Sequence, residues 1–205
     1  MIARLAILGL AAASALGVVS EEVRRVPAAS AQVDFKLNDR LRVIWDPATC
    51  TLGRVTTLDG AERADPLVGM RWIATRFEKS IPVTTRFTEV VTRDGKPEIR
   101  YVLALEGVAE VEVAEAIDEY IHDDKSRPAC WRRFRIGELP HGVVLAQSRD
   151  DVGLAATRVL TRTNATWTWG EARFAKQDNA FTLVRSARLE FPQRGETIVT
   201  VIYDG

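Results

Sequence analysis

Short stretches in which apolar and polar residues alternate recur along most of the chain, and residues typical of turns separate them. The clearest pair is Arg86–Arg93 and Glu98–Leu105, which flank Asp94–Pro97. Alternation with period two is typical of a strand with one buried face, and Asp-Gly is a strong turn signal. A second hairpin is predicted from Leu41–Trp45 and Thr51–Leu58.

The same rhythm continues to the C-terminus and indicates the fold class. Ten or more short strands at roughly ten-residue spacing, with turn signals between them, predict an all-β fold, an antiparallel β-sandwich or a barrel. Of the two we expect the sandwich. No regular series of amphipathic helices separates the strands, which argues against a doubly wound α/β fold. The remaining strands are predicted at Cys130–Ile136, Val143–Gln147, Leu154–Thr161, Ala165–Trp169, Ala180–Phe191 and Thr197–Tyr203.

One segment fits two periods. In residues 108–120, Val111 and Val113 alternate as in a strand, whereas Val113, Ile117 and Tyr120 follow helical spacing. A strand that ends near Val113, followed by a short helix, satisfies both patterns. We therefore predict one short helix near residues 114–121 in an otherwise β-rich domain.

The N-terminus has the composition of an export signal. Arg4 precedes a run from Leu5 to Val19 that is almost entirely apolar. About fifteen apolar residues after a basic one match a secretory signal and fall short of the roughly 18 needed to span a bilayer. Because Ala29-Ser30-Ala31 suits cleavage, residues 1–31 are predicted as signal peptide and pre-mature segment, and residues 32–205 as one β-sandwich domain. Cleavage further upstream and an uncleaved anchor stay open.

This signal is of the bacterial type and predicts a periplasmic or secreted protein, with no integral membrane span after processing. The 28 Lys and Arg residues balance the 28 Asp and Glu residues. A nucleic-acid binder should show a basic excess or a basic stripe, so nucleic acid is not an expected partner.

Cys50 and Cys130 both lie in the predicted mature domain. In an exported protein such a pair is best explained as one disulfide, which would add about 4 kcal/mol by the chain-entropy estimate. Two buried thiols are the alternative interpretation. Two cysteines and two histidines match no zinc-finger spacing.

Few clusters suggest catalysis or metal binding. His122-Asp123-Asp124, with His141 downstream, could form a metal site or an acid–base pair, although its polarity favours an exposed loop. No cofactor and no metal are expected, and the Cys-x-x-Cys-His motif of covalent haem is missing from the sequence. Acidic residues at predicted turns allow many carboxylate pairs, and we nominate no catalytic residue among Asp46, Asp59, Asp65, Asp94, Asp150 and Asp151.

Tryptophan is the more informative residue type, at Trp45, Trp72, Trp131, Trp167 and Trp169. Trp167 and Trp169 lie two apart on a predicted strand and therefore share one face. If that face is exposed, the two rings form a platform roughly 7 Å long on which a sugar ring can stack. If it is buried, the rings belong to the core, which is the commoner fate of such residues.

Arginines next to two of these tryptophans extend the candidate site. Trp131 precedes Arg132 and Arg133, and Arg71 precedes Trp72, which allows cation–π stacking or a small anion-binding face. A solvated charged face is the simpler interpretation. The candidate ligand-binding residues are Trp72, Trp131, Trp167 and Trp169.

Four segments in the first part of the predicted domain share residues with a known type of module: 38–52, Leu67–Gly69, Pro97–Tyr101 and Val108–Glu110. Together they resemble a β-rich module of large secreted bacterial proteins that also carry haem-binding, sorbosone-dehydrogenase-like or sugar-active domains. The resemblance spans residues 35–136 and departs from the pattern after Leu52, where a Trp-x-Gly motif would be expected. It implies polysaccharide handling and assigns no catalytic residues.

These observations lead to an exported, non-catalytic module that binds carbohydrate or a partner protein. The alternative is a carbohydrate-active hydrolase or lyase, which requires two or three carboxylates that converge in one concavity. A periplasmic structural subunit is a third hypothesis and should expose a large apolar patch.

Overall fold

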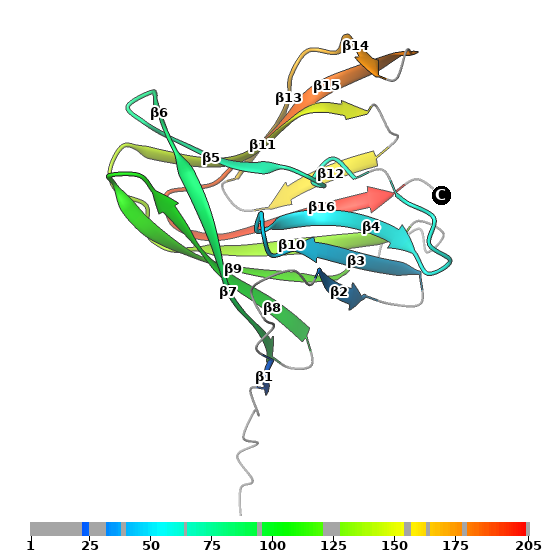
Figure 1. Ribbon diagram of the computed structural model, residues 1–205, viewed down its shortest axis with the longest axis horizontal. Coiled ribbons are helices and arrows are strands. Elements are labelled where there is room, and N and C mark those ends of the chain that lie inside the picture. Colours follow the sequence, from blue (N-terminus) through cyan, green and yellow to red (C-terminus); the bar gives the residue numbers. More distant parts are fainter. Residues whose placement is uncertain are drawn as a thin grey trace, which may run out of the picture.

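Antiparallel strands make up nearly all of the regular structure in the computed structural model of this protein (Figure 1). The structure describes residues 22–24, 32–37, 40–63, 65–93, 96–120, 128–153, 157–162, 165–177 and 180–203. Within them the strands are β1 (Glu22–Arg24), β2 (Val33–Lys36), β3 (Leu41–Asp46), β4 (Thr51–Thr57), β5 (Arg71–Arg76), β6 (Lys79–Ile81), β7 (Val83–Arg93), β8 (Lys96–Leu105), β9 (Ala109–Glu119), β10 (Ala129–Ile136), β11 (Val143–Gly153), β12 (Thr157–Arg162), β13 (Thr166–Trp169), β14 (Arg173–Gln177), β15 (Ala180–Glu190) and β16 (Gly195–Tyr203).

The described strands form three antiparallel sheets. The large sheet has the order β1-β7-β8-β9-β10-β16-β12, in which the consecutive strands β7, β8, β9 and β10 lie side by side. A second sheet has the order β13-β15-β11-β5-β6, with β14 also paired to β15, and a third consists of β2-β3-β4. In Figure 1 the second sheet occupies the upper part of the view, and β2, β3 and β4 lie at the right.

Both smaller sheets cover the same face of the large sheet, which makes the fold a β-sandwich. Trp45 of β3 packs on Tyr101 of β8, with ring centroids 5.6 Å apart. Trp72 of β5 packs on Tyr101 at 6.1 Å and on Phe134 of β10 at 6.3 Å. Tyr101 and Phe134 are buried at alternate inward positions of their strands. The sandwich interior is therefore the layer between the large sheet and its two covers.

The strand predictions are largely confirmed because the alternation that produced them is the burial pattern itself. The predicted hairpins become β3–β4 and β7–β8, and each strand predicted after residue 130 lies wholly or partly in an observed one. The prediction omitted β1, β2, β5, β6 and β14, which are short or carry no clear alternation.

The helix predicted near residues 114–121 is wrong over residues 114–119, which continue β9; Ile121 lies outside the described residues. The inward positions of β9 are Val111, Val113, Glu115 and Ile117, and all four are buried. Because Glu115 interrupts the apolar series, the remaining apolar residues mimic helical spacing. The buried charge of Glu115 therefore made the sequence of a regular strand resemble that of a helix.

The predicted disulfide is not supported, since Cys50 and Cys130 are both buried as thiols without a bond between them. Cys50 ends the turn between β3 and β4 in the small sheet, and its Sγ lies 3.6 Å from the carbonyl oxygen of Pro47. Cys130 belongs to β10 in the large sheet, where it is paired with Glu119 and Val201. The two residues belong to different layers of the sandwich.

Most of the predicted signal region, residues 1–21 and 25–31, lies outside the described residues. Residues 22–24 form β1 and pair with Val90–Thr92 of β7. Within the described part of the chain, no helix has the length and apolar character to cross a membrane.

Candidate functional site

Trp72 is a core residue. Its side chain is 6% exposed, stacks on Phe191 with ring centroids 5.1 Å apart, and donates from Nε1 to the carbonyl oxygen of Cys50 at 3.2 Å. The Trp72 ring is therefore enclosed by core residues. The structure therefore removes Trp72 from the surface where a ligand could reach it.

Trp167 and Trp169 share one face of β13 as predicted, but they do not form a flat platform. Both are half-buried, and their rings stand nearly perpendicular, at 89° with centroids 5.1 Å apart. The guanidinium carbon of Arg185 lies 3.8 Å from the centre of the Trp169 ring. Both rings also pack against the core. Their faces are thus largely covered by one another, by Arg185 and by the interior.

Trp131 is the candidate tryptophan that lies on the outer face of the large sheet. It is half-buried on β10, and the guanidinium of Arg133 lies 5.4 Å from its ring centre. It lines a small hollow of about 70 Å³ together with Glu98 and Asp118.

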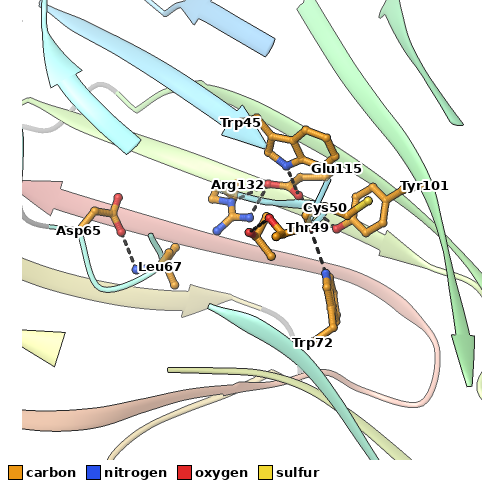
Figure 2. Close-up of polar contacts among 10 residues, drawn as sticks. Trp45, Thr49, Cys50, Asp65, Leu67, Trp72, Tyr101, Glu115 and Arg132 are labelled. Atoms are coloured by element: carbon orange, nitrogen blue, oxygen red, sulfur yellow. Dashed lines mark hydrogen bonds and ion pairs between the residues drawn. The ribbon is translucent and has the colours of Figure 1, made fainter. Parts of the chain in front are cut away.

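A buried ion pair lies inside the sandwich (Figure 2). Glu115 of β9 and Arg132 of β10 are 0% and 1% exposed, and Arg132 donates from Nε to Glu115 Oε1 at 2.7 Å, with Nη2 2.6 Å from the same oxygen. The other carboxylate oxygen accepts from Trp45 Nε1 at 3.3 Å and from the Tyr101 hydroxyl at 3.2 Å. The solvated face expected for Arg132 is wrong, because Arg132 is an inward residue of a strand whose Arg133 and Arg135 face outward.

The cluster around Glu115 is suited to holding the layers together. Burial and the Glu115 carboxylate raise the pKa of Tyr101 well above its ordinary value. Burial lowers the pKa of Arg132, but Glu115 and Tyr101 outweigh this and raise it. Burial also raises the pKa of the Cys50 thiol to about 12, despite an opposing hydrogen bond with Thr85. At neutral pH the phenol and thiol keep their protons, so neither is a nucleophile.

The turn that carries Cys50 joins this cluster to the second sheet. Cys50 has a left-handed backbone with φ of 52°, and its carbonyl oxygen accepts the Trp72 indole N–H (Figure 2). Asp46 stabilises the start of the turn by accepting from the backbone N–H of Ala48 at 2.9 Å. Asp65 similarly accepts from the backbone of Leu67 at 2.7 Å. These aspartates therefore have local structural roles, as is common for Asp in turns.

The largest accessible hollow among those described lies on the opposite, outer face of the large sheet, across β7, β8, β9 and β10. Its volume is about 770 Å³. We call it the outer groove, and its lining residues are Arg86, Thr88, Glu89, Glu98, Arg100, Tyr101, Val102, Glu110, Glu112, Val113, Ala114, Arg135, Ile136 and Gly137.

Strand register explains why this face is hollow. Ala114 of β9 is paired with Arg100 of β8 on one side and Arg135 of β10 on the other. On the outer face of a sheet such paired side chains are neighbours. Because the side chain of Ala114 is only a methyl group and both arginines are long, the surface between the arginines is low and open and forms the floor of the outer groove. The next outward residue of β9 is Ala116, which continues that floor toward the Trp131 hollow.

Ion pairs hold the side chains of the outer groove in place. Arg100 contacts Glu89 and Glu98, both at 3.2 Å, and Arg135 forms a close ion pair with the same Glu98. Arg86 pairs with Glu110 at 3.4 Å. Glu98 faces outward but is only 4% exposed, because the two arginines cover it. Glu98 also lines the Trp131 hollow, so it connects the two depressions.

Sequence reasoning missed these glutamates because it searched for carboxylates at turns. Glu98, Glu110 and Glu112 are instead outward residues of strands. Their signal in the sequence was the set of polar positions that alternate with the predicted core positions. That signal identifies a face of the sheet, whereas register decides which residues of neighbouring strands meet.

The histidine–carboxylate cluster is not brought together in the described structure. His141 is an exposed turn residue whose ring lies 5.9 Å from that of Phe77, and His122-Asp123-Asp124 lies outside the described residues. Within the described ranges, no group of three or more His, Cys, Asp or Glu side chains is arranged to hold a metal ion.

Comparisons of the chain with protein-family models, with curated proteins and with solved structures find no match. The resemblance to the β-rich module of secreted proteins therefore stays a prediction from the sequence.

Proposed function

We propose that this protein is an exported, non-catalytic binding module whose outer groove takes a carbohydrate chain. The observation that carries the proposal is Glu98, an outward carboxylate that is 4% exposed and clamped by Arg100 and Arg135. Side chains held in this way lose little freedom when a ligand binds. Carboxylate oxygens accept and guanidinium groups donate, so together they match the hydroxyl groups of a sugar.

Trp131 supports a carbohydrate as the ligand. Its ring lies on the same face as the outer groove, beyond Ala116, in the hollow that shares Glu98. Aromatic faces complement the apolar C–H faces of sugar rings. The floor from Ala114 to the position of Asp118, which is paired with Trp131, is about 13 Å long at the usual rise per residue. This length suits about two sugar units in a row, at roughly 7 Å for each.

The chemistry of the groove favours carbohydrate over a partner protein. The centre of a protein interface is usually depleted in charge and rich in aromatic or apolar side chains. Half of the residues that line the outer groove are instead charged. In the described part of the chain the large apolar side chains with high exposure are Leu58, Phe77 and Leu160, and none lines the groove.

The location and the resemblance belong to the same proposal. The signal-like residues 1–31 support export to the periplasm or beyond, and the resemblance supports a polysaccharide-handling system. Fractionation of cells that express the full chain tests the location. Recovery of the protein in the cytoplasm with an intact N-terminus would contradict it.

Affinity electrophoresis in gels that contain soluble polysaccharides tests the binding. The double variant Arg100→Ala with Arg135→Ala should weaken the affinity obtained from the retardation at least tenfold, which corresponds to about 1.4 kcal/mol of binding free energy. The matched control, Arg42→Ala with Arg188→Ala, removes two arginines that are also ion-paired but lie on the smaller sheets. Retardation that responds equally to both double variants would contradict the assignment of the groove.

A second variant guards against loss of folding, because removal of both arginines leaves Glu98 uncompensated. Ala114→Trp fills the groove floor from a half-buried outward position without touching the core. Thr168→Trp is its control on an exposed position of β13. Binding that survives Ala114→Trp in a folded protein would refute the groove as the site.

A hydrolase or lyase is the second candidate, because Glu89, Glu98, Glu110 and Glu112 all line one hollow. Against it, three of them are engaged by arginines, whereas catalytic carboxyls must exchange protons with substrate. Release of reducing ends or unsaturated products from a bound polysaccharide, abolished by Glu112→Gln, would favour the enzyme. Binding without product release favours the module.

A further inference from the structure

We infer that the outer groove selects neutral, hydroxyl-rich glycans and rejects acidic ones. This inference rests on the proposed function and specifies its ligand class. Among the lining residues of the groove, three arginines face four glutamates, so its formal charge is negative. The charged lining residues are Arg86, Arg100, Arg135, Glu89, Glu98, Glu110 and Glu112.

The arginines are already compensated by carboxylates. Arg86 pairs with Glu110, and both Arg100 and Arg135 pair with Glu98. A ligand carboxylate would have to displace a glutamate from its arginine, and the displaced glutamate would stay beside it in the same hollow. Two carboxylates that share one site repel each other. The groove therefore opposes the arrival of a further negative charge.

Glu112 strengthens this bias. It is an exposed carboxylate on β9 that lines the groove, and it makes no ion pair with any described residue. Its strand neighbours across the outer face are Val102 of β8 and Gly137, neither of which carries a charge. An acidic ligand in the groove would meet this charge without compensation.

A neutral sugar meets no such penalty. Arg86 and Arg135 each contact their glutamate through Nη2, and a guanidinium group has further N–H donors in a fixed plane. Sugar hydroxyls can accept from these donors and donate to carboxylate oxygens while the ion pairs stay intact. Binding then creates no new buried charge, and its salt dependence should be weak.

A matched pair of polymers, one neutral and one acidic, tests whether the outer groove rejects negative charge. The first is the neutral polysaccharide that the protein retards most strongly, and the second is the same polymer after oxidation of its primary hydroxyls to carboxylates. We expect at least tenfold tighter binding to the neutral polymer than to the oxidised one, and less than threefold change in the affinity for the neutral polymer between about 0.1 M and about 1 M salt.

A charge-removing variant tests the cause. Glu112→Gln should bring the affinity for the oxidised polymer at least threefold closer to the affinity for the neutral one. Glu62→Gln, an exposed glutamate outside the groove, should change neither. Equal or tighter binding of the oxidised polymer by the unaltered protein would overturn the inference while the proposed function stands. Binding to no polymer would refute the proposed function itself.

Discussion

The buried pair Glu115–Arg132 makes a prediction whose sign separates two explanations of its role. Both side chains are at most 1% exposed, and Glu115 has further bonds to Trp45 and Tyr101. If either partner is neutralised, the other is left as an uncompensated charge in the core. Glu115→Gln and Arg132→Met should each lower the free energy of unfolding by about 3–5 kcal/mol.

The double variant Glu115→Gln with Arg132→Met should cost less than either single one. It leaves no buried charge, and the introduced amide can still accept from Trp45 and Tyr101. A net cost of about 2 kcal/mol or less is expected, since replacement of a whole buried pair is often neutral or stabilising. The two changes are thus strongly non-additive.

Urea unfolding followed by tryptophan fluorescence measures these values, because Trp45 and Trp72 are buried and become solvated on unfolding. The control is the exposed pair Arg42–Asp34, whose side chains are 52% and 44% exposed. Neutralising either partner there should cost less than about 1 kcal/mol. Additive costs for Glu115 and Arg132, or single costs below about 1 kcal/mol, would refute this account of the pair.

Three further results are expected. The folded protein raises the pKa of Cys50 from 9.0 to about 12, so the thiol of the unfolded chain loses its proton at a lower pH. The free energy of unfolding should therefore fall between pH 9 and pH 12, by at most about 1.4 kcal/mol per pH unit. Cys50→Ala should flatten this fall when urea midpoints are measured against pH. Glu78 lies in a two-residue hairpin turn and has a left-handed backbone with φ of 66°, which is strained for a residue with a Cβ atom. Glu78→Gly should remove this strain, stabilise the fold by about 1 kcal/mol and raise the thermal midpoint. An unchanged midpoint would show that the turn is unstrained. Trp131→Ala should weaken polysaccharide retardation at least tenfold, whereas Trp167→Ala with Trp169→Ala should change it less than twofold; the reverse order would move the site to β13.

Local sequence was sufficient for the strands that alternate clearly. Ile99, Tyr101 and Leu103 reveal both the strand and its buried face, because period two is a property of the extended backbone itself. The same logic failed at Glu115, since a charge at an inward position looks like an interruption until its partner is known. The partner, Arg132, is 17 residues away and belongs to another strand.

The candidate site depended even more on tertiary structure. The sequence identified Trp131 and Trp72 as equivalent candidates, but the sandwich buries Trp72 and leaves Trp131 on the outer face. The carboxylates considered in the sequence were aspartates at turns, none of which was nominated, whereas glutamates on strands line the outer groove.

The amino-acid sequence alone was sufficient to predict an all-β sandwich with hairpins over residues 41–58 and 86–105, because alternation and turn chemistry act between near neighbours in the chain. Only the tertiary structure decided that Glu98 meets Arg135, 37 residues away, above a floor of alanines. That meeting depends on the register of three paired strands, and register follows from how the inward faces pack against the smaller sheets. The outer groove is therefore a consequence of core packing on the opposite face of the same sheet.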